Sequence, residues 1–326
     1  MSVFFVAGGA GFIGGHLVRR LLSLPGAEVV VYDNFSSGRA WHFPDPESGH
    51  HDALRVVRGD LRDLDRIKIA LPASTDTVFH LASNPDIARA VNEPDIDFWE
   101  GTYLTQNLLE AMRQNGVKRL VYASGSGVYG ETGETLVSEY KTPLRPISTY
   151  GASKLACEAL IRAYSHLYRF EGLALRFANV VGPRQTHGVA YDFVRRLLRD
   201  PSTLRILGDG SQSKSYIHVD DVLDAMLLLR DQGIEGFEEY NVATADALTV
   251  TEIAELCVRR LDAKGVRFDY TGGDRGWKGD VPMIRFDTSK IRARGWAPRY
   301  DTAAAIGLAV DALIEDARAG RFDGER

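Results

Sequence analysis

The segment Gly8–Gly15, GGAGFIGG, places five glycines within eight residues. An apolar run, Val3–Gly8, precedes it and predicts a buried strand, and an amphipathic stretch with helical spacing follows it. Gly9, Gly11 and Gly14 match the pattern G-x-G-x-x-G. In this pattern glycine permits a tight turn and lets the backbone approach a pyrophosphate at a helix N-terminus. The context therefore predicts a dinucleotide-binding turn.

An acidic residue at the end of the next strand supports this interpretation. Asp33 ends the apolar run Glu28–Asp33 and follows Gly14 by nineteen residues, where a carboxylate accepts hydrogen bonds from the adenosine ribose. The same carboxylate would repel a 2′-phosphate, so the pattern favours NAD over NADP. Asp60 ends a third predicted strand, Leu54–Asp60, and is expected at the same edge of the sheet, in contact with the adenine.

Apolar strands alternate with helices over the first half of the chain. Further strands are expected at 76–82, 119–124 and 173–180, and long helices at about 97–114 and 148–169. Such alternation favours a parallel sheet covered on both faces, the doubly wound α/β (Rossmann) arrangement. Glycine-rich and polar loops after residue 180 predict a smaller C-terminal substrate lobe. We expect a dinucleotide-binding domain over 1–178, to which 214–244 returns, and a substrate lobe over 179–213 and 245–326.

Composition restricts the possible partners. A content of 44% hydrophobic and 25% charged residues is typical of a soluble globular protein. The formal charge of −5 gives no basic field for nucleic acid or an anionic membrane. The opening run lacks both the length of a membrane span and the basic segment of a signal peptide. Cys157 and Cys257 stand alone without metal-type pairing, so we expect a cytoplasmic protein with no metal, no nucleic-acid partner and no membrane partner.

A second motif carries the candidate chemistry. The segment STYGASK, Ser148–Lys154, places Tyr150 and Lys154 four residues apart on one face of the predicted long helix. An ammonium beside a phenol stabilises the phenolate, so Tyr150 is a plausible general base towards a substrate hydroxyl. An isolated pair at this spacing would more often be an ordinary surface pair, and the dinucleotide turn upstream favours the catalytic interpretation. His80, in an apolar strand, is expected to be a satisfied core histidine.

A series of short motifs occurs in order across nearly the whole chain: GGAGFIG, YDN, RGDL, FHLAS, VYG, YGASK, RFANVVGPRQ, GDGSQSKSYIHVDD and DTSKIRARGW. Together they resemble the extended short-chain dehydrogenase/reductase family, in particular its nucleotide-sugar epimerases and dehydratases of the UDP-glucose 4-epimerase type. The resemblance implies NAD as cofactor, a nucleotide-diphosphate sugar as substrate and a homodimer formed through the two long helices.

The resemblance also implies roles by position. The cofactor residues would be Gly8, Gly11, Phe12, Ile13 and Gly14 at the pyrophosphate turn, Asp33, Asn34 and Ser37 at the ribose, Asp60 and Leu61 at the adenine, and Ala82 and Ser83 beside the nicotinamide. Tyr150 would be the base and Lys154 would bind the nicotinamide ribose. Ser83 and Asn179 would contact the substrate, the latter at its diphosphate. Tyr150 would take the proton of the sugar 4-hydroxyl as C4 gives a hydride to NAD, and the 4-keto sugar would take the hydride back on its other face.

The chain departs from the family at the catalytic hydroxyl. The Ser or Thr that stands three residues before the Val of VYG is Gly125 here, flanked by Ser124 and Ser126. One of these serines, or a water, would replace the missing donor, and Ser126 is preferred because a shift of one residue would turn it inward. The acid pair of 4,6-dehydratases is Ser126 and Gly127 here. The decarboxylating branch of the family uses a Glu where this chain has Gly127, so neither elimination nor decarboxylation has an evident acid here.

The residues expected at the diphosphate site also differ from the family's pattern. Where the family usually has Arg–Asp, this chain has Lys214–Ser215. Lysine supplies a positive charge but not the two parallel N–H donors with which arginine binds a diphosphate. Trp277 stands where the family has an arginine that binds the diphosphate, and we expect Arg275 to bind the diphosphate instead. The alternative is that Trp277 and Arg275 only pack within the lobe. Phe98 replaces a common Asn and suggests a repacked wall near the nicotinamide.

These patterns favour an NAD-dependent nucleotide-sugar 4-epimerase. Two alternatives stay open. One is a 3- or 5-epimerase or specialised dehydratase that uses the same 4-keto intermediate. The other is a catalytically retired NAD-binding sensor or scaffold. The sequence does not identify the nucleotide base or the sugar.

Overall fold

The computed structural model describes residues 2–44 and 51–322. It divides into two compact units, one formed by 1–128, 148–176 and 225–240 and the other by 129–147, 177–224 and 241–326. This division differs from the expected domains in three places. The segments 129–147 and 177–178 belong to the second unit, and 225–240 rather than 214–244 returns to the first.

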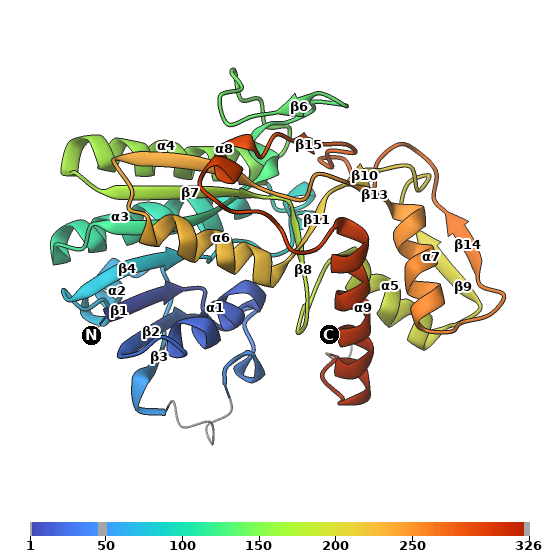
Figure 1. Ribbon diagram of the computed structural model, residues 1–326, viewed down its shortest axis with the longest axis horizontal. Helices are drawn as coiled ribbons and strands as arrows, with labels where there is room; N and C mark the ends of the chain where they lie inside the picture. Colours follow the sequence, from blue (N-terminus) through green and yellow to red (C-terminus); the bar gives the residue numbers. More distant parts are fainter. Residues whose placement is uncertain (1, 45–50, 323–326) are drawn as a thin grey trace. The chain divides into compact units, whose positions relative to one another are not determined.

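The first unit is built on a seven-stranded sheet with the strand order β12-β7-β5-β4-β1-β2-β3 (Figure 1). The strands are β1 (Ser2–Ala7), β2 (Ala27–Asp33), β3 (Leu54–Arg58), β4 (Thr75–His80), β5 (Arg119–Gly125), β7 (Glu171–Phe177) and β12 (Phe237–Val242). β1 pairs in parallel with both β2 and β4, and the pairs β2–β3 and β4–β5 are also parallel. The predicted doubly wound α/β fold is confirmed.

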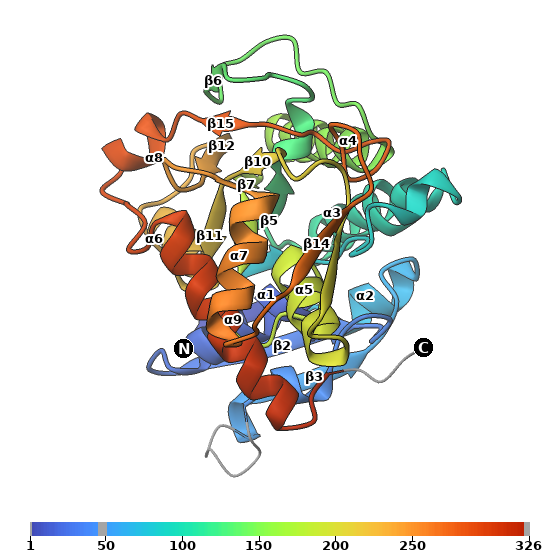
Figure 2. The ribbon, with the colours of Figure 1, turned by 90° about the vertical axis from the view of Figure 1, so that its right-hand side faces the viewer.

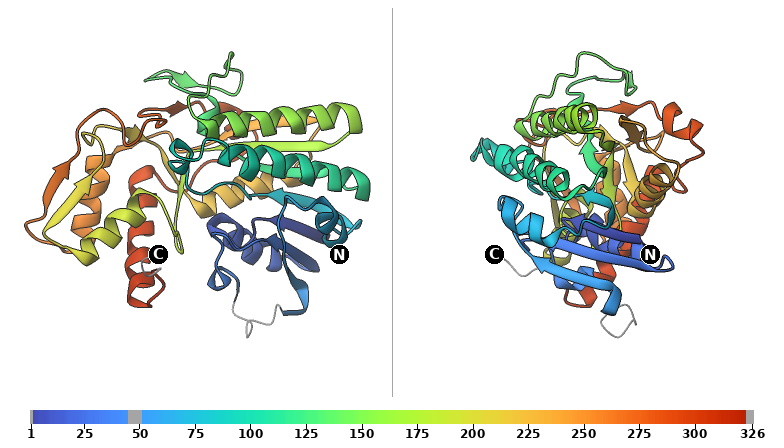
Figure 3. Two further views of the ribbon diagram at one scale, coloured as in Figure 1. Left: turned by 180° about the vertical axis from the view of Figure 1, so that it is seen from behind. Right: turned by 90° about the vertical axis from the view of Figure 1, so that its left-hand side faces the viewer.

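Helices cover both faces of this sheet. They are α1 (Phe12–Leu22), α2 (Leu64–Ala70), α3 (Tyr103–Asn115), α4 (Thr149–Tyr168) and α6 (Val219–Asp231). Phe5 of β1 belongs to a buried cluster with Leu108 of α3 and Ile161 of α4, and α2, α3 and α4 lie side by side (Figure 3). Because side chains alternate along a strand, Phe4 points to the opposite face. There the guanidinium of Arg230, from α6, lies 5.0 Å from the Phe4 ring centroid.

The second unit combines short strands with a separate helical core. Its strands are β6 (Leu136–Val137), β8 (Asn179–Val181), β9 (Thr203–Ile206), β10 (Ser213–Lys214), β11 (Tyr216–His218), β13 (Leu248–Thr249), β14 (Arg267–Tyr270) and β15 (Arg285–Phe286). Its helices include α5 (Val189–Arg199), α7 (Val250–Arg260), α8 (Ser289–Ala293) and α9 (Thr302–Arg318). Figure 2 shows α5, α7 and α9 packed together, and Val194, Ile253 and Val310 are buried between them.

Two predicted elements are divided in the structure. The expected strand 173–180 is interrupted at Ala178, whose N–H donates to Val242 O, so that β7 belongs to the large sheet and β8 pairs with β11. The expected helix from Asp97 begins instead with a π-helical turn, Phe98–Thr102, before α3. Both interruptions depend on tertiary partners that periodicity does not reveal.

Candidate active site

The glycine-rich turn joins β1 to α1 at the carboxyl edge of the sheet. Gly8 has φ +81°, and a Cβ there would lie 2.6 Å from the Ala82 nitrogen, which begins the loop after β4. A Cβ on Gly14 would lie 2.3 Å from Gly8 O. Side chains at these two positions would therefore push the turn away from the helix and from the neighbouring strand.

The N-terminus of α1 is suited to bind an anion. Gly11 is its N-cap residue and has no side chain with which to cap it, and its first turn contains no acidic residue. Uncapped N–H groups and the positive end of the helix dipole favour a phosphate at this point. Phe12, Ile13 and Gly14 form the first turn, as the sequence predicts for the pyrophosphate site.

Asp33 ends β2 beside this turn and is 9% exposed. Its Oδ2 accepts the N–H of Ala10 at 2.9 Å, and its Oδ1 accepts the N–H of Phe35 at 2.8 Å. Burial raises the pKa of Asp33 above its ordinary value, although both N–H bonds oppose this shift. Each carboxylate oxygen keeps a lone pair for a further donor, so the residue fits the predicted role towards ribose hydroxyls.

The expected adenine contact, Asp60, already has a partner. Arg62 donates to both of its oxygens, with Nη2 2.6 Å from Oδ2 and Nε 3.1 Å from Oδ1. Hydrogen bonding to Arg62 lowers the pKa of Asp60. The Asn34 side chain also bonds Asp60. Leu61 is buried. An adenine at this point would meet the lone pairs that Arg62 and Asn34 leave free.

Tyr150 and Lys154 lie on one face of α4, which confirms the predicted placement. Lys154 is 4% exposed, and its Nζ donates to Ala123 O at 2.8 Å. The same ammonium lies 5.4 Å from the ring centroid of Tyr150 and 5.1 Å from that of Tyr122. No carboxylate of the described residues forms an ion pair with Lys154, so its charge acts on the two rings.

The two serines beside Gly125 have different surroundings. Ser124 is buried, and its hydroxyl donates to Glu158 Oε1 at 2.5 Å. Ser126 begins a short 3-10 turn, and its hydroxyl has no hydrogen-bond partner within 2–44 and 51–322. A Cβ added to Gly125 itself would meet no atom within 4 Å. Ser126 is therefore the serine whose hydroxyl is not engaged with another group of the described residues.

The partner of Ser124 belongs to a buried ion pair that the sequence did not reveal. Glu158 accepts from Arg176 Nη2 at 2.7 Å and from its Nε at 3.0 Å. Glu158 follows Lys154 by four residues on α4, and Arg176 lies on β7. The spacing Tyr150, Lys154, Glu158 along one helix was the available signal for Glu158. The ion pair joins β7 to α4, and the hydrogen bond from Ser124 to Glu158 attaches the end of β5 to the same helix.

Gly127 lies close to the start of α4. A Cβ there would be 3.2 Å from the Cα of Gly151 and 3.8 Å from Cδ1 of Tyr150. The first distance is shorter than most Cβ contacts, so even a small side chain would require its neighbours to move. The backbone at this position is therefore adapted to glycine rather than to an acid.

His80 lies in the core of the sheet and is 1% exposed. Its Nε2 lies 2.9 Å from Thr105 Oγ1, while its Nδ1 has no hydrogen-bond partner in the described part of the chain. Thr105 Oγ1 also lies within hydrogen-bond distance of Gly101 O, at 3.0 Å, and of Cys157 Sγ, at 3.1 Å. The prediction of a core histidine holds, but its hydrogen bonding is satisfied on one side of the ring only.

Phe98 is half-exposed and packs edge-on against Trp99, with ring centroids 5.0 Å apart. The polar residue of this turn is its predecessor, Asp97, which is 2% exposed. Ala82 and Ser83, predicted beside the nicotinamide, follow β4 and are half-buried. The sequence indicates a role for Phe98 but carries no signal for the buried carboxylate of Asp97 next to it.

The predicted diphosphate residues lie in the second unit, and both cations are paired with carboxylates there. Lys214 forms an ion pair with Asp280, and Arg275 forms one with Glu131. Asn179 is exposed at the start of β8. Glu131, the partner of Arg275, comes from the segment 129–147, which belongs to the same unit.

Ser215, which replaces the family's usual acid, belongs to a chain of buried hydroxyls. Its Oγ lies 2.6 Å from Thr244 Oγ1, which in turn lies 2.7 Å from Thr302 Oγ1. A carboxylate at position 215 would place a charge among these hydroxyls. Lys214 consequently finds its carboxylate in Asp280 rather than in the residue that follows it.

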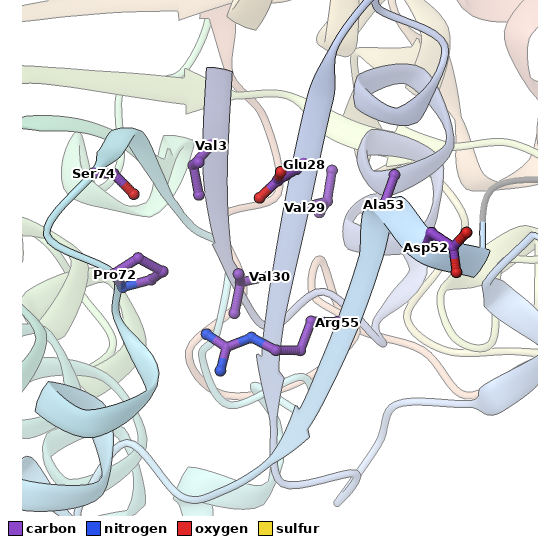
Figure 4. Close-up of a pocket in the computed structure, with 9 residues that line it drawn as sticks. All are labelled: Val3, Glu28, Val29, Val30, Asp52, Ala53, Arg55, Pro72 and Ser74. Atoms are coloured by element: carbon purple, nitrogen blue, oxygen red, sulfur yellow. The ribbon is translucent and has the colours of Figure 1, made fainter. Parts of the chain in front are cut away.

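Two surface hollows of the described residues contain none of these side chains. One of about 280 Å³, lined among others by Val3, Glu28, Asp52 and Arg55, lies at the amino ends of β1, β2 and β3, opposite to the glycine-rich turn (Figure 4). Within the described ranges, no cluster of side chains is arranged to hold a metal ion. Within the same ranges, no helix has the length and apolar character needed to cross a bilayer.

The parallel sheet, the glycine-rich turn with Asp33, and the Tyr150–Lys154 pair together define a dinucleotide-dependent enzyme of the doubly wound class. Residues 4–243 match the family model described as "NAD dependent epimerase/dehydratase family". The chain belongs to this family, whose cofactor is NAD.

Individual relatives span nearly the whole chain. A UDP-glucose 4-epimerase of Mycolicibacterium smegmatis is 33% identical over 94% of this chain and 96% of its own length. The crystal structure of a Thermus thermophilus UDP-glucose 4-epimerase in complex with NAD has a TM-score of 0.83 and 34% identity, covering 96% and 99% of the two chains. A dTDP-glucose 4,6-dehydratase of Streptomyces venezuelae with NAD bound has a TM-score of 0.88 and 30% identity, covering 98% and 99%.

Proposed function

We propose that the protein is a nucleotide-sugar 4-epimerase that works through a 4-keto intermediate. The observation that carries the proposal is the Tyr150–Lys154 pair beside a loop that offers a hydroxyl, Ser126, and no acid. UDP-glucose 4-epimerases among the relatives support the same reaction.

Each side chain has a defined task in this proposal. Tyr150 acts as the phenolate that the Lys154 ammonium stabilises. It removes the proton of the sugar 4-hydroxyl, holds it as a neutral phenol while the 4-keto intermediate exists, and later returns it. Ser126 donates a hydrogen bond to the 4-oxygen as it becomes a carbonyl. When bound, NAD supplies reversible hydride acceptance, so the cycle has no net redox change. The turn at Gly8–Gly14 and the Asp33 carboxylate would hold its pyrophosphate and ribose.

The structural similarity to the Streptomyces enzyme suggests 4,6-dehydration as an alternative reaction. It requires a proton donor for the leaving hydroxyl. Position 127 is a glycine whose Cβ would be crowded by Gly151, and position 126 is a serine. These two residues favour epimerisation.

The test is incubation of the purified protein with UDP-glucose, UDP-N-acetylglucosamine and UDP-glucuronate, followed by GDP-, CDP- and dTDP-sugars. We expect a 4-epimer from at least one of them, and loss of turnover in Tyr150→Phe. Formation of no 4-epimer from any of them would overturn the proposal.

The same reactions run in deuterated water separate the alternatives. Simple 4-epimerisation returns the original hydrogen to C4 and leaves the sugar unlabelled. Deuterium at C3 or C5 would indicate a 3- or 5-epimerase or a dehydratase. Retention of NAD with no turnover of any sugar, unchanged by Tyr150→Phe, would indicate the sensor or scaffold.

A further inference from the structure

A buried carboxylate outside the predicted site, that of Asp97, contacts two elements of the first unit. Its Oδ2 accepts from Thr149 Oγ1 at 2.7 Å, and its Oδ1 accepts from Asn84 Nδ2 at 3.0 Å. The backbone oxygen of Asp97 accepts from Ser153 Oγ at 2.7 Å. With an exposed fraction of 2%, Asp97 has no bulk water to replace these donors.

The two hydroxyls on α4 stand immediately before the catalytic pair. Thr149 precedes Tyr150, and Ser153 precedes Lys154, so the two donors repeat the four-residue spacing on the adjoining face of the helix. The π-helical turn approaches this face closely, because a Cβ on Gly101 would lie 2.3 Å from Ser153 Oγ. Asp97 therefore fixes the rotation of α4 about its axis, and its position along that axis, at the turn that carries Tyr150 and Lys154.

The third donor comes from the loop after β4. Asn84 is 4% exposed, and it also bonds both the N–H and the carbonyl of Asp86. Ala82 and Ser83, the residues predicted beside the nicotinamide, precede it directly. One carboxylate thus joins the predicted nicotinamide loop to the start of the helix that holds the predicted base.

We propose that Asp97 is a positioning residue that sets the Tyr150–Lys154 pair relative to the nicotinamide loop. The inference rests on the proposed function for its catalytic consequence. Hydrogen bonds to a carboxylate are shorter and stronger than those between neutral groups. Two of them on the side chain, with a third on the backbone oxygen, leave Asp97 little freedom of rotation. Small displacements of reacting groups cost large factors in rate, so the role should be measurable in turnover.

The test compares three variants. Asp97→Ala removes both side-chain acceptors. Asp97→Asn can restore them, because its oxygen accepts from Asn84 and its amide donates to the Thr149 hydroxyl. Asn115→Ala is the matched control, since Asn115 also makes two side-chain hydrogen bonds, to Lys68 O at 2.8 Å and Leu71 O at 2.7 Å, but at the far end of α3.

We expect Asp97→Ala to lose about tenfold to a hundredfold in kcat, with a KM for the nucleotide sugar within about threefold of the wild type. Deuterium at C4 of the substrate should slow this variant more than the wild type, because hydride transfer becomes the slow step. Asp97→Asn should recover most of the turnover. Equal kcat and equal isotope effects in Asp97→Ala and Asn115→Ala would overturn the proposal.

A readout without substrate separates this inference from the proposed function. NADH fluorescence reports the surroundings of the nicotinamide ring, so binding of NADH to each variant can be followed whether or not a sugar is turned over. We expect weaker binding and an altered emission in Asp97→Ala and wild-type behaviour in Asn115→Ala. If the wild type turns over no sugar, the proposed function fails while this comparison still decides the role of Asp97.

Discussion

At the residue scale, the proposed hydrogen bond from Ser126 to the sugar 4-oxygen can be tested by moving the hydroxyl from position 126 to position 125. Ser126→Ala should lower kcat by about a hundredfold to a thousandfold, the usual effect of losing one such donor. Gly125→Ser in the Ser126→Ala background should restore turnover, because a Cβ at position 125 meets no atom within 4 Å. Steady-state rates of epimer formation measure both effects.

The alternatives have distinct outcomes. A comparable loss in Ser124→Ala would assign the role to Ser124, despite its bond to Glu158. Unchanged turnover in both alanine variants would mean that a water donates the bond.

His80 should make stability depend on pH. Burial lowers the pKa of His80 to about 3. The unfolded chain gains a proton at this residue below its ordinary pKa of about 6.5, and the folded chain does not until about pH 3, so stability falls as pH is lowered through this window. The full effect is on the order of 4 kcal/mol. Urea unfolding should show a steeper loss for the wild type than for His80→Gln, and parallel slopes would contradict this.

Individual residues differ in how far the sequence predicts them. Asp33, Tyr150 and Lys154 are predictable because their positions follow from local spacing along one strand or helix. The partners of Lys214 and Arg275 are not, since Asp280 and Glu131 stand 66 and 144 residues away in the chain. Such pairings depend on the tertiary fold, and for the same reason the role of Asp97 has no signal in the sequence.

At the scale of elements, the contact between the glycine-rich turn and α1 should control cofactor retention. Gly14→Ala places a Cβ 2.3 Å from Gly8 O, which displaces the helix N-terminus from the pyrophosphate site. We expect purified Gly14→Ala to contain little or no NAD by mass spectrometry. Gly11→Ala is a graded control, because its Cβ would lie 3.3 Å from the same oxygen and should reduce retention less. Equal NAD content in both variants and the wild type would contradict the role of this turn.

The elements were predictable where hydrophobic periodicity alone determines them. The strands that end at Ala7, Asp33 and His80 and the helix that carries Tyr150 agree with expectation within about two residues. The interruption at Ala178 and the π-helical turn Phe98–Thr102 do not alter the apolar pattern, so periodicity does not reveal them.

At the scale of the whole molecule, we predict a homodimer formed through α3 and α4. Ala159 and Ala163 are exposed on α4, and small residues let helices approach closely. Ala163→Glu should shift the protein towards monomer, because it would bury a charge between subunits. Ala303→Glu, an equivalent exposed change on α9, should leave the dimer intact. Light scattering after size-exclusion chromatography measures this, and a monomeric wild type would refute the prediction.

Folding provides no reason for glycine at position 125. Glycine within a strand costs about 0.5–1 kcal/mol relative to alanine through lost chain entropy, and here it gains no close contact in return. A protein engineer could therefore place small side chains such as Ala, Ser or Cys at this position with little risk to the fold. Selection among these variants would sort them by the substrates they accept.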